Sequence, residues 1–481
     1  MRGVALIGGL VLTACATQQA SFGAGAGEEW IEVRTEHFRV RAQLPEAAAV
    51  EAAHGLEARR AGVVAYWGPH LAVKDRLDVI VYRDAAALAD FVAPGFIAQL
   101  SNGPAIITSR EGLRDPAFMR VQAHQIAHHV SAYVMSRQPR WLSEGLAQYL
   151  ETFELDTARE TVTFGRPPGS IGPADLTGQP VTLTELWEWT TEDGQHAQKS
   201  AWAWWLVDCL ASTHAERFDL WQRAIARGEE PKQAWNRSFA GLTDAALEAE
   251  ILGALQLRQL KFGTAPYAFK PGTADVFPLA AADMYALRAE LLLTSSPADF
   301  EVRRRLAVEQ LDSALAADPR NADALVLKAR LIPDPAAARA FAQRLVQVLP
   351  QSAKAWGLLA SLLGRDGEDP RETLQFALAL EPDHPGLLNT LAWYSTLFDD
   401  KAQGLKLAEK AAALRPWSAA MVDTHAAVLG ATGRCQEAAA RQKQALDMLV
   451  HGSAAQRAQY VARLREYETQ CSRTKPTALR Q

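Results

Sequence analysis

Two histidines one helical turn apart are the residues whose types and spacing point most directly to chemistry. They lie in the run His124-Gln125-Ile126-Ala127-His128. Residues at positions i and i+4 of a helix face the same side, so both imidazoles can reach a single metal ion. Zinc in proteins takes such nitrogen ligands in a tetrahedral arrangement. The pair alone is a weak signal, because histidines at this spacing also occur on ordinary helix faces.

A second motif follows as Pro139-Arg140-Trp141-Leu142-Ser143-Glu144-Gly145. Together the two motifs resemble the active-site helices of gluzincin-type zinc metallopeptidases, in which a pattern of the form P-x-W-x-x-E-G supplies a carboxylate ligand. Residues 30–255 resemble the peptidase-MA-like domain of bacterial secreted and lipid-anchored proteins, which is often joined to tetratricopeptide repeats. The resemblance implies that His124, His128 and Glu144 bind Zn²⁺, with water as the fourth ligand.

The sequence departs from this family pattern at Gln125. In the motif His-Glu-x-x-His, the glutamate is the general base that takes a proton from the zinc-bound water. An amide has no protonation equilibrium near neutral pH, so Gln125 cannot act as this base, although it can still form hydrogen bonds. The zinc ligands are unchanged. The sequence therefore predicts a metal site that persists while hydrolysis is strongly weakened.

Other polar residues of this region have less defined roles. His129 would face about 100° away from His128 on the same helix, which favours a packing or supporting role over metal binding. Tyr149 and Glu151 are interpreted as residues of an ordinary helix face. In gluzincins a Tyr, His or Arg elsewhere stabilises the oxyanion, and the candidates here are His196, Tyr133 and Arg140.

A small mixed sheet and a set of helices must position these residues. Alternating polarity predicts strands within 30–41, a β-branched run predicts a buried strand over 77–82, and 105–108 reads as another short strand. By the family resemblance this last segment would be the edge strand that pairs with a peptide substrate. Asp115-Pro116 is typical of a helix start and places both histidines on a helix. The expected fold class of this part is an α+β zincin-like domain.

Regularly spaced prolines mark the C-terminal part. Pro319, Pro350, Pro382 and Pro416 lie 31, 32 and 34 residues apart. Each is followed after six residues by a bulky residue (Leu325, Trp356, Leu388, Val422) and after ten by an alanine (Ala329, Ala360, Ala392, Ala426). Stacked helix pairs need this phase, because the small residue allows close approach and the proline ends the second helix. The pattern resembles tetratricopeptide repeats and predicts an all-α solenoid, with an irregular alanine-rich bundle as the plainer alternative.

Composition shifts suggest where the parts begin and end. The stretch from Phe262 to Pro278 is rich in glycine and proline and is interpreted as a boundary. We expect a signal peptide over 1–14, a flexible tether over 15–29, the zincin-like domain over 30–262, a linker over 263–279, the repeat array with its capping helix over 280–471 and a flexible tail over 472–481.

The N-terminus carries a short apolar stretch followed by Leu12-Thr13-Ala14-Cys15. This resembles the lipobox of bacterial lipoproteins, in which cleavage before the cysteine leaves a lipidated N-terminal Cys15. The resemblance implies attachment to the membrane by the lipid anchor only, in the cell envelope, facing the periplasm from the outer membrane. A plain secretory signal that contains a chance cysteine is the alternative.

Composition and cysteine count limit the remaining possibilities. The 481 residues are 48% hydrophobic and 22% charged with a net charge of −5, which excludes wholesale disorder and a polytopic membrane protein and gives nucleic-acid binding no electrostatic support. Cys435 and Cys471 should begin and end two antiparallel helices of similar length, so we expect them to form a disulfide. Cys209 lies in an apolar run and is expected to be a buried thiol outside any disulfide.

Three functions are compatible with these features. The first is a degenerate metallopeptidase that binds Zn²⁺ and acts mainly through peptide or protein binding by the groove of its repeats. The second is an active zinc peptidase in which another carboxylate replaces the base. The third is an interaction scaffold whose N-terminal domain binds no metal. Metal content separates the third from the others, and peptide hydrolysis separates the second from the first.

Overall fold

A six-stranded mixed sheet forms the centre of the N-terminal half. The computed structural model describes residues 30–68, 76–89, 97–100, 103–168, 180–190, 196–257, 262–294, 300–449 and 453–474. The strands are β1 (Trp30–Arg34), β2 (Phe38–Ala42), β3 (Leu77–Tyr82), β4 (Ile97–Leu100), β5 (Gly103–Ser109) and β9 (Asp275–Leu279), in the order β4-β5-β3-β2-β1-β9. The pairs β2–β3 and β3–β5 are parallel, whereas the other three pairs are antiparallel.

The expected edge strand is in fact an inner strand. Residues 105–108 lie in β5, which pairs with β3 on one side and with β4 on the other. Because the segment 97–100 returns antiparallel along β5 and pairs with its backbone, β4 forms the edge on this side. The prediction of 105–108 as the strand open to a peptide is therefore wrong.

Nine helices of the described chain precede the repeat array. They are α1 (Glu46–Val64), α2 (Ala85–Ala89), α3 (Pro116–Val134), α4 (Arg140–Glu151), α5 (Leu183–Trp187), α6 (His196–Thr213), α7 (Ala215–Ala226), α8 (Pro231–Ser238) and α9 (Asp244–Leu257). The start expected for α3 is confirmed, since the Asp115 side chain accepts a hydrogen bond from the Ala117 N–H and Pro116 occupies the first turn.

The two faces of the main sheet are covered by different parts of the chain. On one face, Val79 and Ile106 share a hydrophobic core with α1, α3 and the tryptophan-rich helices α4 to α8. On the other face, Ile80 and Ile107 share a core with the first helices of the array. This alternation follows from the strand period of two, which sends neighbouring residues to opposite faces. The sheet is therefore buried on both sides.

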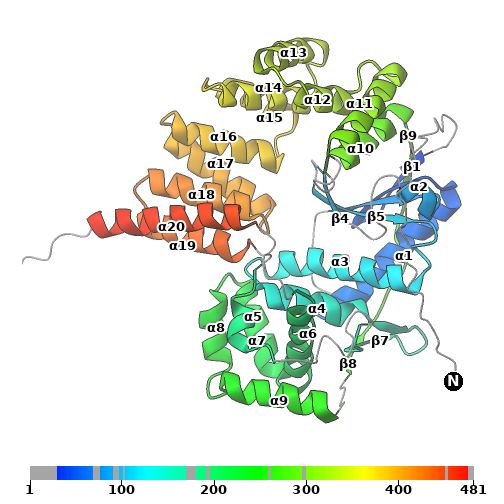
Figure 1. The fold of residues 1–481 in the computed structure, drawn as a ribbon, viewed down its shortest axis with the longest axis vertical. Helices are drawn as coiled ribbons and strands as arrows, with labels where there is room; N and C mark the ends of the chain where they lie inside the picture. Colours follow the sequence, from blue (N-terminus) through cyan, green and yellow to red (C-terminus); the bar gives the residue numbers. More distant parts are fainter. Residues whose placement is uncertain are drawn as a thin grey trace, which may run out of the picture.

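The C-terminal half is an all-α array of consecutive helix pairs. The helices are α10 (Ala281–Thr294), α11 (Phe300–Ala317), α12 (Ala322–Arg330), α13 (Pro335–Val348), α14 (Ala353–Arg365), α15 (Arg371–Leu380), α16 (Pro385–Leu397), α17 (Lys401–Leu414), α18 (Ala419–Ala431), α19 (Cys435–Asp447) and α20 (Ala454–Thr474). Figure 1 shows them stacked one after another. The expected phase is confirmed: the four prolines follow α11, α13, α15 and α17, and the four alanines are buried between helices.

The segment 263–279, expected to be a linker, contains two strands of the N-terminal half. β8 (Gly263–Pro266) joins β6 (Glu154–Asp156) and β7 (Thr161–Phe164) in a three-stranded antiparallel sheet. β9 pairs with β1, with Trp30 opposite Leu279. A linker prediction from glycine and proline content missed these strands, because their partners lie about a hundred residues or more earlier in the chain.

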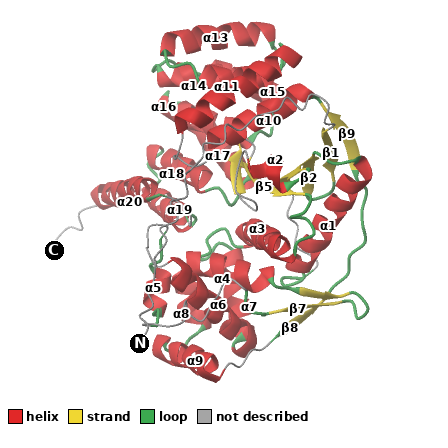
Figure 2. Ribbon diagram, turned by 45° about the vertical axis from the view of Figure 1, so that its right-hand side comes forward, coloured by secondary structure: helices red, strands yellow, loops and turns green. Residues whose placement is uncertain are grey.

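The array curves back to the N-terminal half, as Figures 1 and 2 show. Asp447, at the end of α19, accepts a hydrogen bond of 2.6 Å from Nη2 of Arg137 in the connection between α3 and α4. Nη1 of Arg137 donates to the Gly228 carbonyl at 2.8 Å. The Tyr133 and Trp417 rings also meet, with centroids 6.0 Å apart. The array thus contacts the rest of the molecule at both of its ends.

Several expected features lie outside the described residues. They are the signal peptide 1–14, the tether 15–29 with the lipidation site Cys15, and the part of the tail that follows α20. Within the described part of the chain, no helix is both long and apolar enough to cross a membrane.

Candidate metal centre

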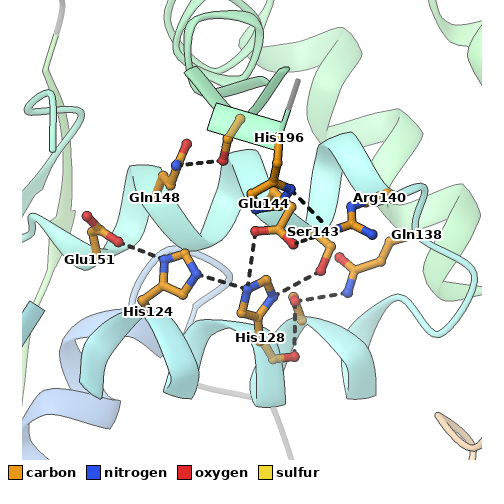
Figure 3. A network of polar contacts seen from close by, with 11 residues as sticks. His124, His128, Gln138, Arg140, Ser143, Glu144, Gln148, Glu151 and His196 are labelled. Atoms are coloured by element: carbon orange, nitrogen blue, oxygen red, sulfur yellow. Dashed lines mark hydrogen bonds and ion pairs between the residues drawn. The ribbon is translucent and has the colours of Figure 1, made fainter. Parts of the chain in front are cut away.

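The packing of α3 against α4 brings three potential metal ligands together. His124 and His128 extend from α3, and Glu144 extends from α4 (Figure 3). The Nε2 atoms of the two histidines are 3.0 Å apart, and Nε2 of His128 is 3.8 Å from Oε2 of Glu144. One donor atom from each residue lies within 4.8 Å of the others. The structure therefore brings together the three residues expected as ligands.

The other ring nitrogen of each histidine has its own polar partner. Nδ1 of His124 is 2.7 Å from Oε2 of Glu151, and Nδ1 of His128 is 3.0 Å from Oγ of Ser143. Metal-binding histidines are oriented in this way, with the non-ligating nitrogen held by a carboxylate or another polar group. Both rings consequently direct Nε2 to the same point.

The protonation states required by a metal ion fit these contacts. If His124 carries its proton on Nδ1, it donates that proton to the carboxylate of Glu151, and Nε2 keeps its lone pair. The Ser143 hydroxyl can donate or accept a hydrogen bond, so its oxygen can accept a hydrogen bond from a protonated Nδ1 of His128. The two rings can then present two lone pairs, which is the donor set of a catalytic-type zinc site when Glu144 is added.

The supporting roles of Glu151 and Ser143 were not predicted from the sequence. Glu151 was interpreted as an ordinary helix-face residue, and Ser143 was given no role. A signal for Glu151 was available, because Glu144 and Glu151 are seven residues apart and so lie on the same face of α4. For Ser143, spacing alone gives no indication, since its contact with His128 depends on how α3 and α4 pack.

Arg140 lies behind the carboxylate of Glu144. Its Nη2 atom is 3.8 Å from Oε1 of Glu144 and 3.4 Å from Nδ1 of His196, and its guanidinium lies over the Trp189 ring at 4.9 Å. Arg140 and His196 are thus brought to the site, as Figure 3 shows. Tyr133, the third residue expected as an oxyanion stabiliser, contacts the rings of His129 and Trp417 instead.

Gln125 and His129 lie on α3 beside the converging groups. Gln125 is half-buried, and its side chain has no hydrogen-bond partner among the residues that the structure describes. His129 is not one of the three converging groups, and its ring packs on Tyr133 at 5.3 Å. Position 125 therefore carries an amide next to the two histidines, with no described contact that would give it another role.

Trp141 and Gly145 of the second motif hold α4 in place. The Trp141 side chain is fully buried and stacks on Trp221 with centroids 5.4 Å apart. A Cβ atom on Gly145 would lie 2.5 Å from the Ala203 carbonyl oxygen, so the glycine is what allows α6 to approach α4 this closely. These contacts fix the helix that carries Glu144, and both tryptophans lie in the core.

Tyr149 is part of that core. Its ring lies beside Tyr66 and Phe164, with centroids 6.2 Å and 6.4 Å away. Burial, strengthened by the nearby Asp208, raises the pKa of the Tyr149 hydroxyl above its usual value. The side chain therefore stays neutral and packs against its neighbours.

The cysteines divide between the two halves of the molecule. Cys435 is the first residue of α19, and Cys471 lies in α20. The two are joined in a disulfide, with their Cα atoms 5.4 Å apart. Cys209 is buried in α6 and forms no disulfide with a described residue.

Comparisons with known proteins identify no family for this chain. No protein-family model matches the sequence, and no curated protein matches it. Among solved structures, a MamA protein aligns with a TM-score of 0.27 and 21% identity, over 35% of this chain and 92% of that chain. A thermophilic TPR protein of Thermus thermophilus gives 0.31 and 18%, over 39% and 99%. Yeast Tom70 gives 0.32 and 12%, over 76% and 82%. With all of these TM-scores below 0.5, the description of the array as helix pairs rests on the packing of α10 to α20.

Proposed function

We propose that this protein is a metal-binding, zincin-like domain with little or no hydrolytic activity, joined to a repeat array that binds a peptide or protein. The observation that carries the metal proposal is the pair of contacts from the two Nδ1 atoms, to Glu151 and Ser143. Such contacts select the orientation in which both Nε2 atoms point at one place. Two histidines that met by chance on a helix surface would not require these two Nδ1 contacts.

The roles of the residues follow from their positions. His124, His128 and Glu144 would hold the ion, and Arg140 steadies the carboxylate of Glu144 from its other oxygen. Bound zinc supplies a Lewis acid that polarises carbonyl oxygens and lowers the pKa of water. The neutral amide of Gln125 neither takes nor gives a proton at this place, so the chain lacks the general base at the position where the zincin motif has one.

Neither carboxylate near the histidines is available to act as a general base, which supports the proposal of weak catalysis. Glu144 converges with the histidines as a ligand, and Glu151 holds Nδ1 of His124 at 2.7 Å. Each is already committed by its contacts, so neither is a ready substitute for the missing base. Loss of a well-placed general base typically lowers the rate by roughly 10²–10⁴-fold.

Zinc binding by the purified full-length chain tests the metal site. We expect the variant His124→Ala/His128→Ala to lose one zinc equivalent relative to wild type, measured by elemental analysis after exchange into zinc and gel filtration. His54→Ala, which removes a half-buried histidine from α1, is the matched control and should keep the full content. Unchanged zinc content in the double variant would exclude the site and leave an interaction scaffold without metal here.

Peptide hydrolysis tests the missing base. Wild type should cleave a mixture of generic peptides slowly or not at all, and Gln125→Glu should raise the zinc-dependent rate because it restores a carboxylate at the motif position. Gln125→Ala is the matched control and should not raise the rate. Robust zinc-dependent cleavage by wild type would instead show an active peptidase that uses a substitute base.

The repeat array is proposed as the binding element. A hollow of about 830 Å³ lies between α16, α18 and α20, and Trp393 and Leu397 are among the residues that line it. Both side chains are exposed to solvent, so they are available to an apolar partner segment. Cross-linking from a photoreactive residue at position 397 should therefore capture a partner in intact cells, whereas the same probe at Leu220, an equally exposed leucine on α7, should not.

Attachment to the envelope through Cys15 is part of the proposal. Cells grown with a labelled fatty acid should incorporate the label into wild type and not into Cys15→Ser. Label in the Cys15→Ser variant, or none in wild type, would contradict lipidation at this residue.

A further inference from the structure

A second group of metal-ligating side chains lies among the helices beyond the first site. Cys209 lies near the end of α6, His214 immediately follows α6, and Glu250 extends from α9. Nε2 of His214 is 2.7 Å from Oε2 of Glu250, and Sγ of Cys209 is 3.7 Å from the same oxygen. One donor atom from each residue lies within 4.8 Å of the others, and none of the three belongs to the site on α3 and α4.

The chemistry of this group matches zinc more closely than a simple ion pair. A thiol, an imidazole and a carboxylate are the three side-chain types that zinc sites use, and three protein ligands leave a fourth position for water. The Cys209 thiol donates a weak hydrogen bond to the same carboxylate oxygen that pairs with His214, so the three groups converge on one point.

The exposure of the three side chains to solvent increases from Cys209 to His214 to Glu250. Cys209 is almost fully buried, the His214 side chain is 15% exposed and the Glu250 side chain is 39% exposed. An ion from solvent would therefore meet the carboxylate first and reach the sulfur in a drier place. A thiolate in such a place needs a nearby positive charge, which a bound divalent cation supplies.

We propose that Cys209, His214 and Glu250 form a second zinc site with three protein ligands. A bound ion would join the end of α6 and the start of α7 to the middle of α9, which the hydrogen bonds of Cys209 and His214 to Glu250 already link. Because α6 packs on α4, which carries Glu144, the ion would also support the frame of the first site. This proposal does not depend on zinc binding at His124 and His128.

The experiment removes the first site so that the second is measured alone. The full-length background variant His124→Ala/His128→Ala/Cys15→Ser retains Cys209 outside the Cys435–Cys471 disulfide. Titration with zinc against a chromophoric chelator should give one bound equivalent in this background and none after Cys209→Ser is added. Titration with cobalt should give a sulfur-to-cobalt charge-transfer absorption that Cys209→Ser abolishes.

Two further variants keep the test decisive if Cys209→Ser does not fold. His214→Gln and Glu250→Gln change more exposed side chains, and each should weaken zinc binding while keeping the cobalt–sulfur absorption at high cobalt concentration. Circular dichroism confirms the fold, and zinc should raise the thermal unfolding midpoint of the background only while all three ligands are present. A background variant that binds no zinc, or that binds it without the cobalt–sulfur absorption, would overturn the proposal whatever the outcome at the first site.

Discussion

The contacts within the N-terminal half join residues far apart in the sequence, whereas the contacts within the repeat array join helices that are close in the sequence. In the N-terminal half, β1 pairs with β9, so that Trp30 lies opposite Leu279, and His124 meets Glu151 from another helix. In the array, each helix packs mainly on the next one or two. A change in the first region therefore acts on distant segments and on the site, whereas a change in the array acts on its immediate neighbours.

The buried residues of the two regions differ in the same way. The candidate metal centre buries paired polar groups whose geometry matters, such as the Glu144 side chain and Arg140, each 8% exposed. In the array, four equivalent positions of the repeats are buried alanines, for example Ala360 and Ala392, which fill space between helices and carry no polar side-chain atoms, although the array also buries the hydrogen-bonded pair Gln442 and Asp423. The comparison teaches that the candidate site depends on the orientation of a few polar groups, whereas the repeated positions of the array depend on close packing of small residues. The following predictions test this difference.

The largest effect should come from the covalent bond at the end of the array. Cys435→Ser removes a disulfide that closes a loop with a sequence separation of 36 residues. In the chain-entropy model such a loop contributes roughly 3–4 kcal/mol to the free energy of unfolding. Denaturant unfolding of full-length protein should show this loss in the transition of the array, while zinc binding at His124 and His128 stays unchanged. Equal loss of zinc binding would show that the array is not independent of the site.

The next effect concerns orientation at the metal centre. Glu151→Gln keeps the size of the side chain but removes the charge that holds Nδ1 of His124. Removing such a supporting group typically costs about 10–100-fold in metal affinity. Zinc titration should show this loss, whereas Glu154→Gln, an exposed glutamate just beyond α4, should have no effect. Unchanged affinity in Glu151→Gln would mean that packing alone orients His124.

A matched pair of glycine substitutions tests the packing of the two regions. Gly145→Ala places a methyl group 2.5 Å from the backbone of α6, which cannot move without disturbing the core, so we expect a loss of about 1–3 kcal/mol and weaker zinc binding. Gly364→Ala in α14 meets only the Tyr394 side chain, which can rotate away, and alanine favours the helix by up to about 1 kcal/mol. Denaturant unfolding should show no loss in the second variant. Similar losses in both would contradict the contrast between regions.

The smallest effect is a pH dependence within the array. Burial lowers the pKa of His384 below the usual value for histidine, and nearby Arg415 and Lys354 lower it further, although Glu381 opposes this. Neutral His384 also caps α16, since Nδ1 accepts a hydrogen bond of 3.2 Å from the Leu387 N–H. Below about pH 6.5 the unfolded chain binds a proton that the folded chain resists, so this contribution to stability is lost as the pH falls from that value toward the folded pKa.

Asparagine at position 384 separates this effect from other titrations. Asn is a good N-cap that does not titrate, so His384→Asn should reduce the fall of the unfolding midpoint between about pH 7.5 and 5.5. The midpoint at the higher pH should change little. A pH dependence identical to that of wild type would show that His384 does not contribute.

Much of the local structure could be predicted from the sequence. The i, i+4 spacing placed His124 and His128 on one face of a helix, Asp115-Pro116 marked the start of that helix, and the prolines marked the ends of the repeats. The pairing of Cys435 with Cys471 also followed from the lengths of two neighbouring helices. Each of these depends on residues within one or two elements, where helix geometry and end signals are sufficient.

Only the tertiary structure decided how distant elements meet. It made β5 an inner strand, built residues 263–279 into two sheets, and placed the first helices of the array on the sheet. It also set Glu151 against His124 and brought Glu250 of α9 to Cys209 and His214 at the end of α6. Hydrophobic periodicity identifies a buried face but not the face it will pack against, and that choice depends on the fit of the whole core. The sequence therefore determined the candidate ligands and the helices that carry them, whereas the packing between elements determined their orientation.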